Sequence, residues 1–132
     1  MTPELYWLAA TVLMTSLMWT PYILNRIAVR GLVGALANET PQSPPHAPWA
    51  ERAMAAHRNA VENLVVFAPA VLLAHTVGVS TGVTTTAAML YFFARLGHYV
   101  VYTAGVPVAR TLTFAVGAFC TIAIVLAALG WI

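Results

Sequence analysis

Long stretches without a charged residue constrain this chain more than any other feature. Residues 5–24 and 111–132 contain no Asp, Glu, Lys or Arg, and about 20 apolar residues in a helix cross the roughly 30 Å hydrocarbon core of a bilayer. The chain is 61% hydrophobic and 8% charged, whereas soluble domains carry about 25% charged residues. Six arginines and four glutamates cannot cover the surface of a 14.1 kDa soluble globule. The sequence therefore predicts an integral membrane protein.

Prolines and glycines divide the chain into segments. The stretch 38–48 contains four prolines and predicts a connector, with Pro48 in the first turn of the following helix. Gly78 and Gly82 flank a predicted tight turn, and Gly105 with Pro107 predicts another break. Pro21 is expected to kink the first span near its end. We predict one all-α domain over residues 1–132, an antiparallel bundle of four transmembrane helices with spans at about 5–26, 60–78, 83–106 and 111–131 and a cytoplasmic loop at about 27–58.

The arginines predict the orientation of this bundle. Cytoplasmic loops of membrane proteins carry an excess of Lys and Arg. The second loop has no charge, whereas the first and third loops and their flanks hold Arg26, Arg30, Arg52, Arg58 and Arg110. We therefore expect these two loops in the cytoplasm and both termini outside, in the inner or cell membrane.

Polar residues inside the apolar spans predict a functional site. A charge at bilayer depth costs about 2.5–3.5 kcal/mol on insertion scales, and Glu62, Arg95 and His98 lie within predicted spans. Antiparallel spans bring most of the ionisable groups, together with the amide of Asn59, into the cytoplasmic leaflet. The residues gathered there are Arg26, Arg58, Asn59, Glu62, His98, Tyr102 and Arg110.

The spacing of these residues groups them on helix faces. Arg95, His98 and Tyr102 stand at i, i+3 and i+7, which gives one stripe on one helix. Arg58 and Asn59 stand four and three residues before Glu62, which predicts a compact patch. The structural alternative is an ion pair between Arg58 and Glu62, with Arg95 snorkelling to the headgroups.

The residue types favour a small zwitterion with more than one carboxylate as the ligand. Arginines bind carboxylates through paired hydrogen bonds, and Glu62 would bind an ammonium group. Glutathione has two carboxylates, an amine and a thiol whose free pKa is about 8.5, so a nearby arginine would favour its thiolate. Four histidines on separate segments and a single cysteine do not form a metal-binding pattern, so we expect no metal site. The net charge of +2 gives no indication of nucleic-acid binding.

Three stretches of the sequence resemble the MAPEG family, the membrane-associated proteins in eicosanoid and glutathione metabolism. Residues 51–64 are similar to the family's Glu-Arg…Arg-Asn-x-x-Glu stretch, and residues 95–102 to its Arg-x-x-His-x-x-x-Tyr motif. Residues 107–114 are similar to its Pro-x-x-Arg entry to the last span. The chain resembles bacterial-type, glutathione transferase-like members in particular.

The resemblance implies a homotrimer that binds glutathione between neighbouring subunits near the cytoplasmic face. It implies Arg110 as the residue that stabilises the glutathione thiolate. The positions implied for glutathione binding or its support are Arg26, Arg58, Asn59, Glu62, Arg95, His98 and Tyr102. The expected function is a glutathione transferase or peroxidase acting on hydrophobic electrophiles that dissolve in the surrounding lipid.

Two other functions are compatible with a four-span chain. Some MAPEG members are non-catalytic lipid-binding proteins, and Ala55 stands where the best-known enzymes have a further arginine, while Phe114 replaces a tyrosine of some members. A small multidrug transporter would need a carboxylate deep in its first span, but Glu4 lies at the very start of that span.

Overall fold

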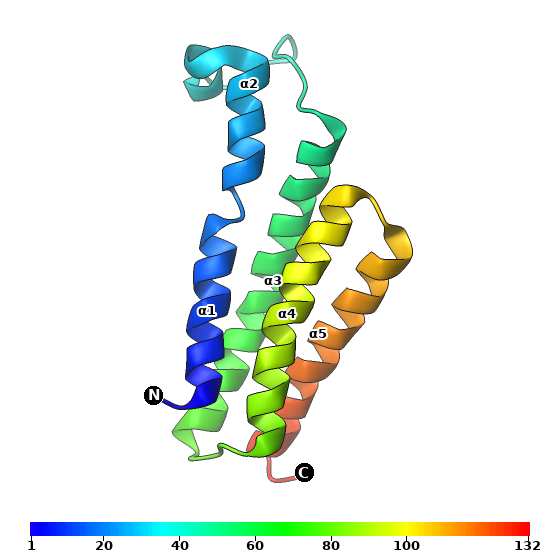
Figure 1. The fold of residues 1–132 in the computed structure, drawn as a ribbon. Helices are drawn as coiled ribbons and strands as arrows, with labels where there is room; N and C mark the ends of the chain where they lie inside the picture. The colour runs from blue at the N-terminus through cyan, green and yellow to red at the C-terminus, as the bar shows by residue number, and fades with distance from the viewer.

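A computed structural model describes residues 1–132 as an antiparallel bundle of helices (Figure 1). The five helices are α1 (Pro3–Leu17), α2 (Thr20–Leu36), α3 (Pro48–Thr76), α4 (Gly82–Ala104) and α5 (Pro107–Ala128). Helices α1 and α2 follow one another along one side of the bundle and together form its first membrane-crossing stretch. Both termini lie at the same end as the α3–α4 turn, opposite the connector between α2 and α3. The predicted all-α, four-span fold is thus confirmed.

Prolines and glycines set most of the helix boundaries. The first stretch breaks at Met18 and Trp19, and Pro21 lies in the first turn of α2. A proline ring clashes with the carbonyl four residues earlier, which here belongs to Leu17, the last residue of α1. The break predicted for Pro21 therefore occurs, but just before the proline. Gly105 ends α4 in the left-handed conformation, with φ of 79°, as the predicted break requires.

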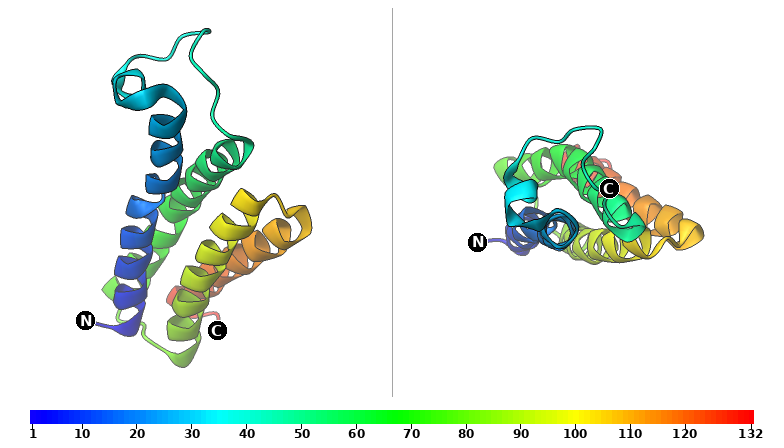
Figure 2. Two further views of the ribbon diagram at one scale, coloured as in Figure 1. Left: turned by 45° about the horizontal axis from the view of Figure 1, so that its top comes forward. Right: turned by 90° about the horizontal axis from the view of Figure 1, so that it is seen from above.

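The connector between α2 and α3 is shorter than the predicted loop of 27–58. Helix α2 continues to Leu36, although its axis changes direction at Gly31, where φ is 69°. Helix α3 begins at Pro48, as the sequence predicted. From above, the end of α2 and the connector arch over α1 and α3 (Figure 2).

The composition of the helices agrees with a multi-pass membrane protein in contact with lipid. Three stretches are long and apolar enough to cross a bilayer: Pro3–Leu36, Pro48–Thr76 and Pro107–Ala128. Helix α4 has 23 residues and packs against α1, α3 and α5. Arg95 and His98 interrupt its apolar sequence, and both side chains are buried within the bundle.

Small residues allow the helices to approach closely. Helix α3 buries alanines along its inner face, a common device where membrane helices pack. In the core, the ring of Phe67 on α3 stacks on that of Tyr91 on α4, with 3.6 Å between centroids.

A buried carboxylate joins α1 to the start of α4 at the end that holds the termini. Glu4 is 2% exposed and accepts hydrogen bonds from the hydroxyls of Ser80, Thr84 and Thr85, at 3.0, 2.5 and 3.0 Å. These hydrogen bonds offset the free-energy cost of removing the carboxylate from water, which is high for a buried charge without partners. Glu4 therefore connects elements that lie more than 70 residues apart in the sequence.

Glu4→Ala should lower the thermal stability of the protein in detergent micelles. Hydrogen bonds to a charged group contribute about 1.5–3 kcal/mol each, and the freed hydroxyls recover part of the loss, so we expect a destabilisation of about 2 kcal/mol. Glu4→Gln keeps one acceptor oxygen and should therefore lose less stability than Glu4→Ala. Equal unfolding midpoints for Glu4→Ala and the wild type would show that this carboxylate does not hold the two helices together.

Candidate functional site

A buried arginine on α4 organises the polar centre of the bundle. The Arg95 side chain is 1% exposed, and its Nη2 donates to Oδ1 of Asn59 on α3 at 2.6 Å. The same Nη2 lies 3.5 Å from Nδ1 of His98, one turn further along α4. Arg95 forms no ion pair, and its Nε and Nη1 have no hydrogen-bond partner. The guanidinium is therefore held inside the protein by neutral groups, and it does not snorkel to the headgroups.

A glycine on α5 provides the space for the Arg95 side chain. A Cβ atom built on Gly117 would lie 3.3 Å from Cδ of Arg95 and 3.7 Å from a ring carbon of Tyr91. The stripe predicted on α4 thus faces the interior, and α5 accommodates it by having no side chain at the contact.

Next to Arg95 lies a polar cavity of about 200 Å³ between α3, α4 and α5, which we call the cationic cavity. It is lined by Asn59, His98, Tyr102, Arg110, Thr111 and Phe114. The Arg110 guanidinium lies 4.7 Å from the centroid of the Tyr102 ring, a cation–π contact that orients both side chains. The His98 and Tyr102 rings meet edge to face at 5.5 Å.

The chemistry of the cationic cavity suits an anion. Its lining includes one guanidinium, two hydroxyls, an amide and an imidazole, and it includes no carboxylate. Arg110 lies in the first turn of α5, where helix N-termini also favour negative charge. A thiolate or carboxylate in this cavity would therefore meet hydrogen-bond donors and positive charge.

A second cavity, of about 310 Å³, lies on another face of α3, next to α2. We call it the zwitterionic cavity, because Arg58 and Glu62 line it together with Tyr22, Met54, His57 and Val61. The Tyr22 hydroxyl and His57 Nδ1 are 2.8 Å apart and join α2 to α3. Arg58 and Glu62 are exposed, and they form no ion pair with each other. The structural alternative of an Arg58–Glu62 ion pair is therefore wrong for this chain.

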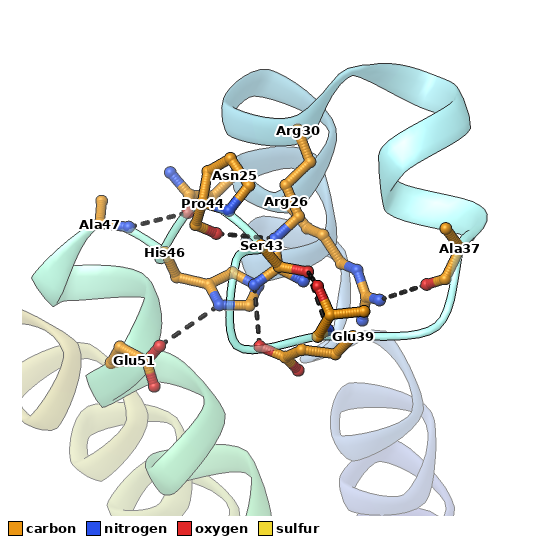
Figure 3. A network of polar contacts seen from close by, with 11 residues as sticks. Asn25, Arg26, Arg30, Ala37, Glu39, Ser43, Pro44, His46, Ala47 and Glu51 are labelled. Carbon is orange, nitrogen blue, oxygen red and sulfur yellow. Dashed lines mark hydrogen bonds and ion pairs between the residues drawn. The ribbon is translucent and has the colours of Figure 1, made fainter.

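Arg26 lies outside both cavities. Its Nη2 donates to the carbonyl of Ala37 at 3.2 Å, and it helps to hold the connector (Figure 3). Nearby, Arg30 donates to the Glu39 carboxylate at 2.9 Å. This hydrogen bond and the Arg30 charge hold the pKa of Glu39 below its usual value. In a single chain, Arg26 and Arg30 thus support the connector.

The structure divides the predicted site residues into four groups. Asn59, His98, Tyr102 and Arg110 line the cationic cavity, Arg95 lies behind its wall, Arg58 and Glu62 line the zwitterionic cavity, and Arg26 holds the connector. The predicted patch of Arg58, Asn59 and Glu62 is thus split, because Asn59 points toward α4. Thr111 was not anticipated, although it follows Arg110 in the same helical turn.

The lining of the largest cavity contains no charged side chain. It is an open apolar groove of about 560 Å³ between α4 and α5, and its lining runs from Gly82 to Ala123. Its only sulfur is that of Cys120, which is buried.

Comparison with known proteins identifies one family. The model of the MAPEG family matches residues 5–130, nearly the whole chain. No curated protein matches the sequence.

Proposed function

Since this chain belongs to the MAPEG family, we propose that it is a membrane-embedded glutathione transferase or glutathione peroxidase that acts on hydrophobic electrophiles. The cationic cavity is the observation that carries the proposal. Its lining comes from α3, α4 and α5 and offers a guanidinium and several hydrogen-bond donors but no carboxylate.

In this proposal, the cationic cavity receives the glutathione sulfur. The thiol has a pKa of about 8.5 in water, and a fixed positive charge stabilises its thiolate. Arg110 supplies this charge. In conjugation, the thiolate attacks an electrophilic carbon, the S–C bond forms and the leaving group departs with its electron pair. In peroxide reduction, two glutathione thiols are oxidised to a disulfide while the hydroperoxide becomes an alcohol and water.

The zwitterionic cavity binds the charged ends of the glutathione backbone. Glu62 binds the ammonium group and Arg58 a carboxylate. Both side chains are exposed on a helix that crosses the membrane, with no partner in their own chain, and such groups usually face a protein interface or a ligand. We therefore propose a homotrimer in which this face of one subunit meets the cationic cavity of a neighbour, so that each glutathione lies between two subunits.

The membrane supplies the second substrate in this proposal. Apolar side chains are exposed on all five helices, so lipid surrounds the site and concentrates apolar electrophiles around it. The excess of arginine in the first and third loops orients the site toward the cytoplasm, where glutathione would enter from water.

Calorimetric titration of the purified protein with glutathione tests this proposal. The wild type should bind, and Glu62→Gln should weaken the affinity about 10- to 100-fold, since a hydrogen bond to a charged group contributes about 1.5–3 kcal/mol. Glu39→Gln is the matched control, because Glu39 lies in the connector and pairs with Arg30. Its affinity should equal that of the wild type.

Two results would contradict the proposal. Absence of binding at millimolar glutathione would favour the non-catalytic, lipid-binding alternative that Ala55 suggests. Equal affinities for Glu62→Gln and the wild type would remove Glu62 from the site.

A further inference from the structure

The amide of Asn59 has only one orientation that its neighbours allow. Its Oδ1 lies 2.6 Å from Nη2 of Arg95 and 3.3 Å from Nδ2 of Asn63. A guanidinium has no acceptor atom, and Asn63 also donates to the Asn59 backbone carbonyl, at 2.8 Å. A flipped amide would place N–H groups against two donors. Oδ1 is thus fixed on the inner side, and Nδ2, which has no partner in the chain, is left for the cationic cavity.

The ring of His98 is constrained by the same guanidinium. Its Nδ1 lies 3.5 Å from Nη2 of Arg95. Because the guanidinium can only donate, Nδ1 must act as the acceptor, and the proton of the neutral ring resides on Nε2. No group of the chain accepts a hydrogen bond from Nε2, and His98 lines the cationic cavity. The second N–H group is therefore also available to a ligand.

We propose that Arg95 is a positioning residue, which acts from behind the cavity wall by fixing the Asn59 amide and the His98 tautomer so that both present N–H groups to an anion. Arg95 is 1% exposed and does not line the cavity. Of the two roles that the family resemblance implies, binding glutathione or supporting its site, we therefore assign Arg95 the second. The proposal rests on the proposed function in one respect: the anion is the thiolate or a carboxylate of glutathione.

The arrangement explains why a buried arginine lacks an acidic partner. A carboxylate in place of Asn59 would pair with Arg95 more strongly, but it would also turn an acceptor oxygen toward the cavity and repel the anion. An amide satisfies both sides, because it accepts from Arg95 and donates to the ligand.

Asn59→Asp separates this role from a purely structural one. The new carboxylate keeps the contact with Arg95, so the unfolding midpoint should not fall. Glutathione affinity should fall at least tenfold, since one donor becomes a repelling acceptor. Asn38→Asp makes the same charge change in the exposed connector, and its affinity should remain that of the wild type. If Asn59→Asp is stable and binds glutathione normally, Asn59 presents no donor and the proposal fails.

Nitrogen NMR of the histidine rings provides a test that needs no ligand. At about pH 8, above the ordinary histidine pKa of about 6.5, the wild type should show His98 protonated at Nε2, with the signal assigned by its loss in His98→Gln. Arg95→Met should give a mixture of both tautomers. A His98 ring protonated at Nδ1 in the wild type would overturn the inference. Because glutathione is absent, a failure of the proposed function alone would leave this result unchanged.

Discussion

Arg110→Ala should lower the turnover of a model electrophile about 100- to 1000-fold, the usual effect of removing one preorganised electrostatic contact. The guanidinium lies at the N-terminal turn of α5 and is held over the Tyr102 ring at 4.7 Å. In this proposal its charge stabilises the reactive thiolate of bound glutathione more than the unreactive thiol. Glutathione itself should still bind within about tenfold, because the backbone contacts of the ligand remain.

The ultraviolet absorbance of the bound thiolate distinguishes this role from a structural one. The absorbance should disappear in Arg110→Ala together with turnover. Arg110→Lys keeps a positive charge and should retain part of both signals, although lysine lacks the planar group that stacks on Tyr102. A folded Arg110→Ala variant that keeps the thiolate absorbance and normal turnover would show that Arg110 only anchors the start of α5 at the membrane surface.

The helical organisation could be predicted because its determinants are local. Pro48 and Pro107 begin helices and Gly105 ends one, through backbone restrictions that need no tertiary information. The break in the first membrane-crossing stretch was harder to predict. The sequence indicated a kink near Pro21, but the helix ends at Leu17 because the proline ring clashes with the carbonyl of the preceding turn.

The distribution of the site residues between two cavities could not be predicted without knowing how the helices of the bundle pack. Successive residues on a helix point about 100° apart, so Arg58 and Asn59 can belong to one patch or to two. Arg95 on α4 contacts Asn59 and not Arg58, so the two residues belong to two separate patches. The contact of Glu4 could not be predicted from the sequence either, because its hydroxyl partners follow α3, more than 70 residues later.

The burial of Arg95 gives the second large effect, in which stability and function should change in opposite directions. A buried charge without an ionic partner is costly, and replacing buried ionic groups by apolar residues of similar volume can stabilise a protein by about 1–4 kcal/mol. Arg95 has two unpaired nitrogens and only neutral partners, and Asn63 can still donate to Asn59 when Arg95 is absent. Arg95→Met should therefore raise the unfolding midpoint in detergent.

The same substitution should lower glutathione affinity at least tenfold. The ring of His98 loses the group that sets its tautomer, and the amide of Asn59 keeps only the 3.3 Å contact with Asn63 to orient it. Arg52→Met is the matched control. It removes a guanidinium that donates to the Thr103 carbonyl at 2.8 Å, outside both cavities, so it should cost about 1 kcal/mol of stability and leave affinity unchanged. A fall in the unfolding midpoint of Arg95→Met would show that the guanidinium stabilises the bundle. Normal affinity in the stable variant would show that the cationic cavity does not depend on it. Only a more stable protein that binds poorly fits an arginine retained at the expense of stability to orient a binding site.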